Sequence, residues 1–253
     1  MGEPNQELCV AAISPRKGSS HEIRDARHRG GVGWGADTIY GRVSQMEKDK
    51  LEFMKILKVT KQSLAEAVSI MKNGGAVIYP TETAYALGCD AMSKRAMKKI
   101  FQIKKRPKSK GLPVICATKK QVEKFFIMPG MAWMIWKKHW PRPVSVVLET
   151  RDRGQGARQV PVRISSNKIA RELARKLERP IVSTSANISG AGAIYDSKKI
   201  IESFARRKYR PDLVLDAGRL PERKPSTIVK ISESGKIEIL RQGEISPHLA
   251  KYP

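Results

Sequence analysis

Two hydrophobic patterns alternate along the chain from about residue 57 onward. Apolar residues at helical spacing follow Thr60, which can cap a helix that ends at Gly74–Gly75, and Ser93 caps a second helix in the same way. Further helices are expected at 119–126, 129–141 and 168–178. Short apolar runs between the helices predict buried strands at 76–79, 112–117, 145–148, 160–164, 181–183, 213–216, 226–231 and 236–241.

Strands that alternate with helices are typical of an α/β sheet. A tight turn at 233–236 joins the last two expected strands, which predicts that they pair antiparallel. The expected fold class is therefore α/β, with a twisted, mixed parallel and antiparallel open sheet flanked by helices. In the helix at 129–141, Met131, Trp133, Met134 and Trp136 are expected to pack in the core rather than to bind a cofactor.

Residues 1–55 differ from the rest. The stretch RHRGGVGWGADTIYGR at 28–42 is rich in glycine and arginine and has no periodicity, which predicts a disordered basic arm. The expected organisation is an arm at 1–55, one folded domain at 56–245 and a short tail at 246–253.

Charge and cysteine content narrow the function classes. The chain has 49 basic and 24 acidic residues and a net charge of +25, a balance that favours contact with polyanions such as nucleic acid or nucleotide phosphates. Its three cysteines have no CxxC spacing, which argues against disulfides and zinc and fits a cytoplasmic protein. No apolar stretch approaches the roughly 20 residues of a membrane helix, so no membrane is expected.

Polar clusters stand at the ends of expected elements, and each has an ordinary structural explanation as a helix cap, a surface loop or a strand-end charge. Together they suit a site that fixes a small zwitterion and several phosphates. The clusters are Thr81–Thr83, the run KKRPKSKG at 104–111, Arg163 with Ser165–Asn167, STSAN at 183–187, and Ser226–Thr227 with Arg241.

Several catalytic motifs are missing from the sequence. It contains no GxxxxGK[ST] phosphate loop, no GxGxxG after an expected strand, and no HExxH or His/Cys ligand set among its four histidines. A metal held by protein side chains is therefore not expected. The pattern favours chemistry by positioning two substrates and neutralising charge.

The ordered set of motifs resembles the YrdC family, the L-threonylcarbamoyladenylate synthases of the single-domain type. The match covers about residues 58–243 and includes GGAVIYPTETAYALGCDA, IFQIKKRPKSKGLPVICA, VPVRI, PIVSTSANISG and the closing PSTIVKI and ILRQGEI. The resemblance implies a nucleotidyltransferase that makes threonylcarbamoyl-AMP and pyrophosphate from L-threonine, bicarbonate and ATP with Mg²⁺. It also implies a role in tRNA threonylcarbamoyladenosine modification, with transfer to tRNA by a separate KEOPS-type enzyme.

The resemblance also implies site residues. Thr83, Arg163 and Ser183 resemble threonine-binding residues. Lys104 and Arg106 resemble catalytic phosphate ligands. The other ATP contacts that it implies are Lys110, Ser185, Asn187, Ser226 and Arg241.

The chain departs from the family pattern at Ala117, where longer members have a histidine. An alternative function is a non-catalytic module that binds double-stranded RNA or tRNA through the basic concave face, to which Lys119, Lys120 and Lys124 would contribute. The carbamoyl-transfer domain of hydrogenase maturation is a third alternative, disfavoured because the chain lacks that system's acylphosphatase and zinc fingers.

Overall fold

The computed structural model describes residues 54–107, 111–151, 159–232 and 234–245. The predicted arm (up to residue 53), the whole predicted tail, and Lys110 lie outside the described residues. Met54 is buried and Lys55 is already in a strand, so strand structure begins within two residues of the predicted boundary at 55/56.

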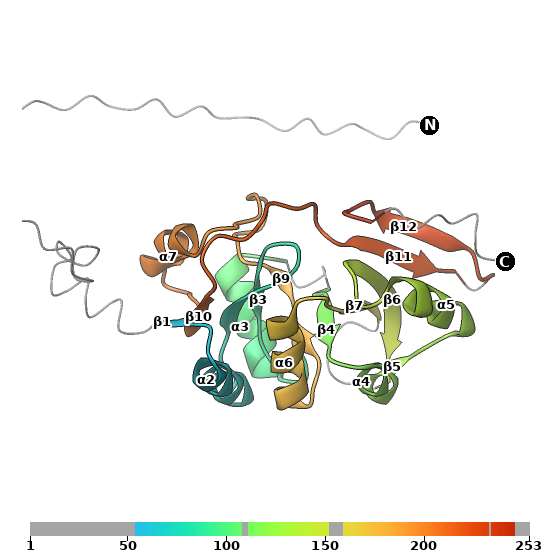
Figure 1. Cartoon of the computed structure of the whole chain (residues 1–253), viewed down its shortest axis with the longest axis horizontal. Helices are drawn as coiled ribbons and strands as arrows, with labels where there is room; N and C mark the ends of the chain where they lie inside the picture. Colours follow the sequence, from blue (N-terminus) through green and yellow to red (C-terminus); the bar gives the residue numbers. More distant parts are fainter. Residues whose placement is uncertain (1–53, 108–110, 152–158, 233, 246–253) are drawn as a thin grey trace, which may run out of the picture. The chain divides into compact units, whose positions relative to one another are not determined.

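The described residues form twelve strands and six helices, and the strands belong to two sheets (Figure 1). Sheet A has the strand order β1-β10-β2-β3-β9, in which β1, β10 and β2 run parallel and the last two pairs are antiparallel. Its strands are β1 (Lys55–Lys58), β2 (Val77–Pro80), β3 (Tyr85–Gly88), β9 (Thr184–Ser185) and β10 (Leu213–Asp216).

Sheet B has the order β12-β11-β6-β7-β4-β8, with β5 paired to β6. It mixes parallel pairs (β11 with β6, β4 with β7) and antiparallel pairs, including the predicted β11–β12 hairpin, which confirms the mixed α/β fold class. Its strands are β4 (Val114–Cys116), β5 (Phe126–Ile127), β6 (Val144–Thr150), β7 (Gln159–Ile164), β8 (Ile181–Val182), β11 (Thr227–Ile231) and β12 (Ile237–Arg241).

The predicted caps open the first two described helices. The Thr60 hydroxyl accepts from the N–H of Ser63 while Ser63 accepts from the N–H of Thr60, a capping box, and the Ser93 hydroxyl accepts from Ala96. The helices are α2 (Lys61–Lys72), α3 (Lys94–Lys104), α4 (Lys119–Phe125), α5 (Gly130–His139), α6 (Lys168–Leu177) and α7 (Ser197–Ala205).

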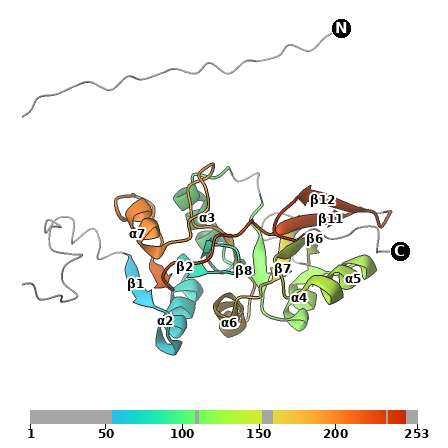
Figure 2. The same ribbon diagram turned by 45° about the horizontal axis from the view of Figure 1, so that its top comes forward.

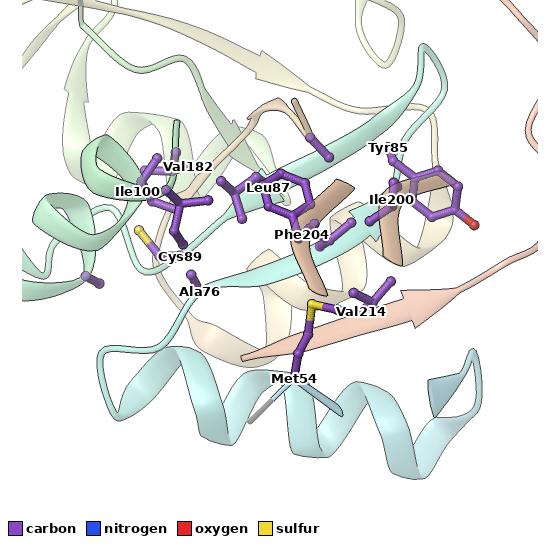
Figure 3. Close-up of a cluster of buried hydrophobic side chains, with 14 of the residues drawn as sticks. Met54, Ala76, Tyr85, Leu87, Cys89, Ile100, Val182, Ile200, Phe204 and Val214 are labelled. Atoms are coloured by element: carbon purple, nitrogen blue, oxygen red, sulfur yellow. The ribbon is translucent and has the colours of Figure 1, made fainter. Parts of the chain in front are cut away.

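Three buried apolar clusters hold helices against the sheets. In the cluster of Figure 3, Ile100 of α3 and the α7 residues Ile200 and Phe204 pack on Leu87 and Val214 of sheet A. A second cluster joins α2 and α6 to strands of both sheets, and a third packs α4 and α5 against sheet B. Burial of this apolar surface is the main force that fixes both sheets.

The chain crosses from one sheet to the other at Ser183, because β8 pairs with β4 of sheet B while β9 pairs with β3 of sheet A. Gly88 makes this approach possible: a Cβ there would lie 2.0 Å from the Val182 carbonyl oxygen. Figures 1 and 2 show the two sheets on either side of this junction. Sheet A lies toward α2 and α7, and sheet B lies toward α5.

The structure differs from the sequence predictions in several elements. Residues 85–88, for which no strand was expected, form β3, and Pro80, just beyond the strand expected at 76–79, pairs with Tyr85 in the β2–β3 hairpin. In α5 the buried residues are Ala132, Ile135 and His139, so the expected core packing of the methionines and tryptophans is only partial. Among the described helices, none is long and apolar enough to cross a membrane.

Candidate functional site

A cleft of about 550 Å³ opens beside the junction of the two sheets. Its walls come from the β2–β3 turn, the segment after α3, the middle of β7, the segment that follows β8, and the strands β11 and β12. All the predicted site residues that the structure describes, except Lys104, line this cleft: Thr83, Arg106, Arg163, Ser183, Ser185, Asn187, Ser226 and Arg241. The fold thus brings together side chains that are up to 158 positions apart in the sequence; their individual roles stay predictions.

The turn 81–84 presents Thr83 to the cleft. The Thr81 hydroxyl donates to the carbonyl of Ala84 at 2.6 Å and accepts from the N–H groups of Thr83 and Ala84. A hydroxyl that satisfies several backbone groups in this way fixes a tight turn. The Thr83 hydroxyl lies 3.1 Å from that of Thr81, so its position is set by the turn.

Arg163 occupies the middle of sheet B, where its neighbours in β7 are apolar. Its Nε lies 3.2 Å from Oε1 of Glu82, and its Nη2 donates to the Ser183 hydroxyl at 3.4 Å. The Ser165 hydroxyl donates to the other oxygen of Glu82. A charge with only 5 % of its side chain exposed is tolerated because it is paired and hydrogen-bonded.

Residues 183–192, which we call the shelf, form a second wall of the cleft. The Asn187 side chain organises this segment: its Oδ1 accepts from the Ser185 hydroxyl at 2.7 Å, and its Nδ2 donates to the carbonyls of Ala191 and Gly192. The amide group of Asn187 therefore fixes the loop, while the residue still lines the cleft.

Lys104 lies beneath the shelf and does not line the cleft, which differs from its expected position as a phosphate ligand. Its Nζ donates to the carbonyl oxygens of Ser185 (2.5 Å) and Asn187 (2.8 Å) and to Oδ1 of Asn187 (2.9 Å). An ammonium has three N–H donors, so these contacts use all of them. Burial, and secondly the charge of Arg106, lower the pKa of Lys104 to about 8.

Arg241 and Arg106 add to the cationic lining. Arg241 of β12 donates through Nε and Nη2 to the carbonyl of Ser226, and through Nη2 to its hydroxyl at 3.0 Å. Arg106 donates to the carbonyl of Gly111 at 3.0 Å. Burial lowers the pKa of both, and the nearby charge of Arg163 also lowers the pKa of Arg241. These shifts mark partly desolvated cations that an anion in the cleft would stabilise.

The described residues that line the cleft include four arginines and no aspartate or glutamate. They offer hydroxyl, amide and guanidinium groups, a donor set suited to carboxylate and phosphate oxygens. Across the described parts of the chain, no three His, Cys, Asp or Glu side chains are grouped to hold a metal ion.

Sequence reasoning missed several residues of the site. Glu82 stood within the PTET motif, but its ion pair joins residues 81 positions apart, and no local pattern reveals that. Tyr195 and Arg223 also line the cleft, and the Tyr195 hydroxyl donates to the Arg223 carbonyl at 2.9 Å. Ala117, at the position of the histidine of longer family members, is buried in the core and does not line the cleft.

The sequence matches a known protein family and several of its members. The family model for Sua5, YciO and YrdC proteins, described as telomere recombination, matches residues 69–243. A threonylcarbamoyl-AMP synthase of Psychromonas ingrahamii is 33% identical over 171 residues, which cover 64% of this chain and 89% of the relative.

Solved structures give the same grouping. P. abyssi Sua5 complexed with L-threonine superposes with a TM-score of 0.67 at 30% identity, covering 75% of this chain, and this chain spans only 57% of the Sua5 chain. E. coli YciO superposes with a TM-score of 0.64 at 26% identity, covering 76% of this chain and 94% of the YciO chain.

Proposed function

Because the chain belongs to the Sua5/YciO/YrdC family, we propose that it is an L-threonylcarbamoyladenylate synthase, a nucleotidyltransferase. The proposed reaction converts L-threonine, bicarbonate and ATP into threonylcarbamoyl-AMP, pyrophosphate and water. The observation that carries the proposal is the cleft, where residues from both sheets place hydroxyls, an amide and four arginines around about 550 Å³. None of the described residues that line it is an aspartate or glutamate. That volume lies within the range of small-molecule sites.

The amino acid is proposed to bind on the side of Thr83, Arg163 and Ser183. The solved Sua5 complex with L-threonine supports this choice of substrate. A guanidinium held in the middle of a sheet suits a substrate carboxylate, which it can meet with paired N–H donors. The threonine amine is carboxylated to a carbamate, which then carries a second anionic group into the cationic cleft.

ATP is proposed to bind between the shelf and β11–β12, with Arg106, Ser185, Asn187, Ser226 and Arg241 as contacts. One carbamate oxygen attacks the α-phosphorus while the bond to pyrophosphate breaks. Arg106, the proposed catalytic cation, offsets the charge that grows on the leaving group. Lys104 acts through the shelf in this proposal, because its three donors hold the shelf from below.

Mg²⁺ is proposed to enter with ATP. The lining lacks carboxylates, so the described residues do not supply a ligand set of the kind that Mg²⁺ prefers, and triphosphate oxygens and water would hold the ion. The chemistry we assign to the protein itself is binding, orientation and charge neutralisation.

The product is proposed to serve a separate, KEOPS-type transferase that modifies tRNA, in the cytoplasm. Buried free thiols at Cys89 and Cys116 fit a reducing compartment. Direct RNA binding through the basic surface is a separate hypothesis that no contact in the cleft favours.

The test uses the purified full-length chain with ATP, Mg²⁺ and bicarbonate. Pyrophosphate release should require L-threonine, and mass spectrometry should find threonylcarbamoyl-AMP. Arg163→Ala should abolish threonine-dependent release, whereas Arg175→Ala, an exposed arginine of α6 paired with Glu172, should leave it unchanged. Pyrophosphate release that is absent or independent of threonine contradicts the proposal.

A further inference from the structure

Glu82 links the two sheets at the amino-acid side of the cleft. It stands on the turn between β2 and β3 of sheet A, and its carboxylate reaches Arg163 on β7 of sheet B. Only 10 % of its side chain is exposed, and it does not line the cleft. It therefore lies behind the binding surface rather than in it.

Both carboxylate oxygens of Glu82 have a defined partner. Oε1 accepts from Nε of Arg163 at 3.2 Å, and Oε2 accepts from the Ser165 hydroxyl. The Ser165 hydroxyl also accepts from the N–H of Asn167, the residue that caps α6. Glu82 is thus held by a rigid strand end and helix start, as a residue that orients another must be.

The contact with Glu82 determines which atoms of Arg163 face the substrate. The guanidinium is planar, so fixing its Nε and placing Nη2 against Ser183 sets the direction of the remaining donors. Because Arg163 lines the cleft, these donors are presented there. The same carboxylate belongs to the turn that carries Thr83, so one residue couples the two groups that we assign to threonine.

From this geometry we infer that Glu82 is a positioning residue for the amino-acid substrate, acting through Arg163 and the turn 81–84. The inference rests on the proposed function. It assigns Glu82 no contact with substrate and no proton transfer. Its effect is on how tightly the substrate carboxylate binds, and not on the nucleotide.

The first measurement compares Glu82→Ala with Glu82→Gln in the full-length chain. Loss of the acceptor frees the guanidinium, so Glu82→Ala should raise the KM for threonine about tenfold and change the KM for ATP less than about twofold. A glutamine oxygen can still accept from Nε, and the Ser165 hydroxyl can turn to accept from the amide. Glu82→Gln should therefore keep the KM for threonine within about threefold of the wild-type value.

Glu66→Ala is the matched control, because Glu66 forms a 2.6 Å ion pair with Lys55 on the surface, away from the cleft. It should leave both KM values unchanged. If Glu82→Ala behaves like this control, the inference is overturned. It is also overturned if Glu82→Ala raises both KM values equally, which would indicate a general structural role.

A second measurement uses L-threoninol, which has the amine and hydroxyl of threonine but no carboxylate. The wild type should bind threonine more tightly than threoninol by calorimetry, and both Glu82→Ala and Arg163→Ala should lose that preference. The double variant should add little to Arg163→Ala, since both changes remove one interaction; additive losses would contradict the inference. A wild-type chain that binds no threonine would instead refute the proposed function.

Discussion

Two walls of the cleft are each held from behind by one charged side chain that is at most 10 % exposed, but in opposite ways. The turn 81–84 and Arg163 are held by Glu82, so the holding contact is a pair of opposite charges. The shelf is held by Lys104, which contacts only neutral oxygens and has the positive charge of Arg106 nearby.

This difference determines what each wall depends on. The threonine side is held by an ion pair between opposite charges, whereas the shelf is held by the ammonium of Lys104 without a carboxylate partner among the described contacts. The ammonium of Lys104 has its pKa lowered to about 8 and can lose one of its three donors in a mildly basic solution. We therefore expect the threonine side to depend on geometry alone, and the nucleotide side to depend on protonation as well.

On the nucleotide side, the largest effect is expected from removing the charge under the shelf. Lys104→Met leaves three oxygens without their donor but also removes a buried charge, so the free energy of unfolding should fall by about 2 kcal/mol. Because the shelf loses its support, kcat/KM for ATP should fall about a hundredfold while threonine affinity changes far less.

Lys98→Met, on the exposed side of the same helix, is the control for Lys104→Met and should be close to wild type in both measurements. Chemical denaturation and steady-state kinetics report the two quantities. If Lys104→Met weakens threonine binding as much as it lowers kcat/KM for ATP, the two walls do not differ in the way we expect.

The position of Lys104 illustrates how far sequence reasoning reaches. The caps at Thr60 and Ser93 and the apolar spacing that follows them predicted α2 and α3, because local backbone chemistry decides where a helix starts. The run KKRPKSKG suggested a solvated loop, yet Lys104 ends α3 four positions after the buried Ile100, and so lies on its buried face. The helical spacing from Ile100 indicates a buried position for Lys104, but the run of charged residues around it favoured a solvent-exposed loop.

Contacts between distant segments were beyond sequence reasoning. The polar clusters were expected to form one site together, and each of them contributes at least one residue to the cleft. The Glu82–Arg163 pair was not expected, because the two residues meet only once both sheets are packed. The two-residue strands β5 and β9 also depend on tertiary pairing, since segments this short carry no periodicity.

Arg106 provides a test of the shelf side without disturbing its support. Arg106→Ala should raise the KM for ATP ten- to thirtyfold, because a cation proposed to meet the phosphates is lost. The free energy of unfolding should change by less than about 0.5 kcal/mol, since Arg106 lies at the cleft surface. Unfolding comparable to that of Lys104→Met would show that Arg106 supports the fold instead of the substrate.

The pH dependence of the two KM values should distinguish the two walls, with a several-fold change expected for ATP alone. As pH rises through about 8, Lys104 loses its proton and one shelf contact, so the KM for ATP should increase while the KM for threonine, corrected for titration of the amino acid itself, stays flat. Lys104→Met should show no such increase. A threonine KM that rises in parallel would remove the distinction.

The free energy of unfolding should increase over the same pH range in which ATP binding weakens. The pKa of Lys104 is lowered from 10.5 in the unfolded chain to about 8 in the folded one, so between these values the unfolded chain binds more protons. Through this group, the free energy of unfolding increases as pH rises from 8 to 10.5, by at most about 1.4 kcal/mol per pH unit. Below pH 8 the group is protonated in both states and gives no pH dependence. Denaturation of wild type against Lys104→Met at pH 7 and 9.5 measures the difference.

The smallest effect is expected at Tyr195, which holds the segment before β11 without any charge. Its hydroxyl donates to the Arg223 carbonyl at 2.9 Å, but its own carbonyl also accepts from the N–H of Leu220 at 2.7 Å, so the backbone contact survives a side-chain change. Tyr195→Phe should therefore raise the KM for ATP only two- to threefold, roughly the value of one neutral hydrogen bond, with threonine unaffected. A larger loss than that of Arg106→Ala would mean that neutral contacts, and not buried charges, determine the geometry of the nucleotide side.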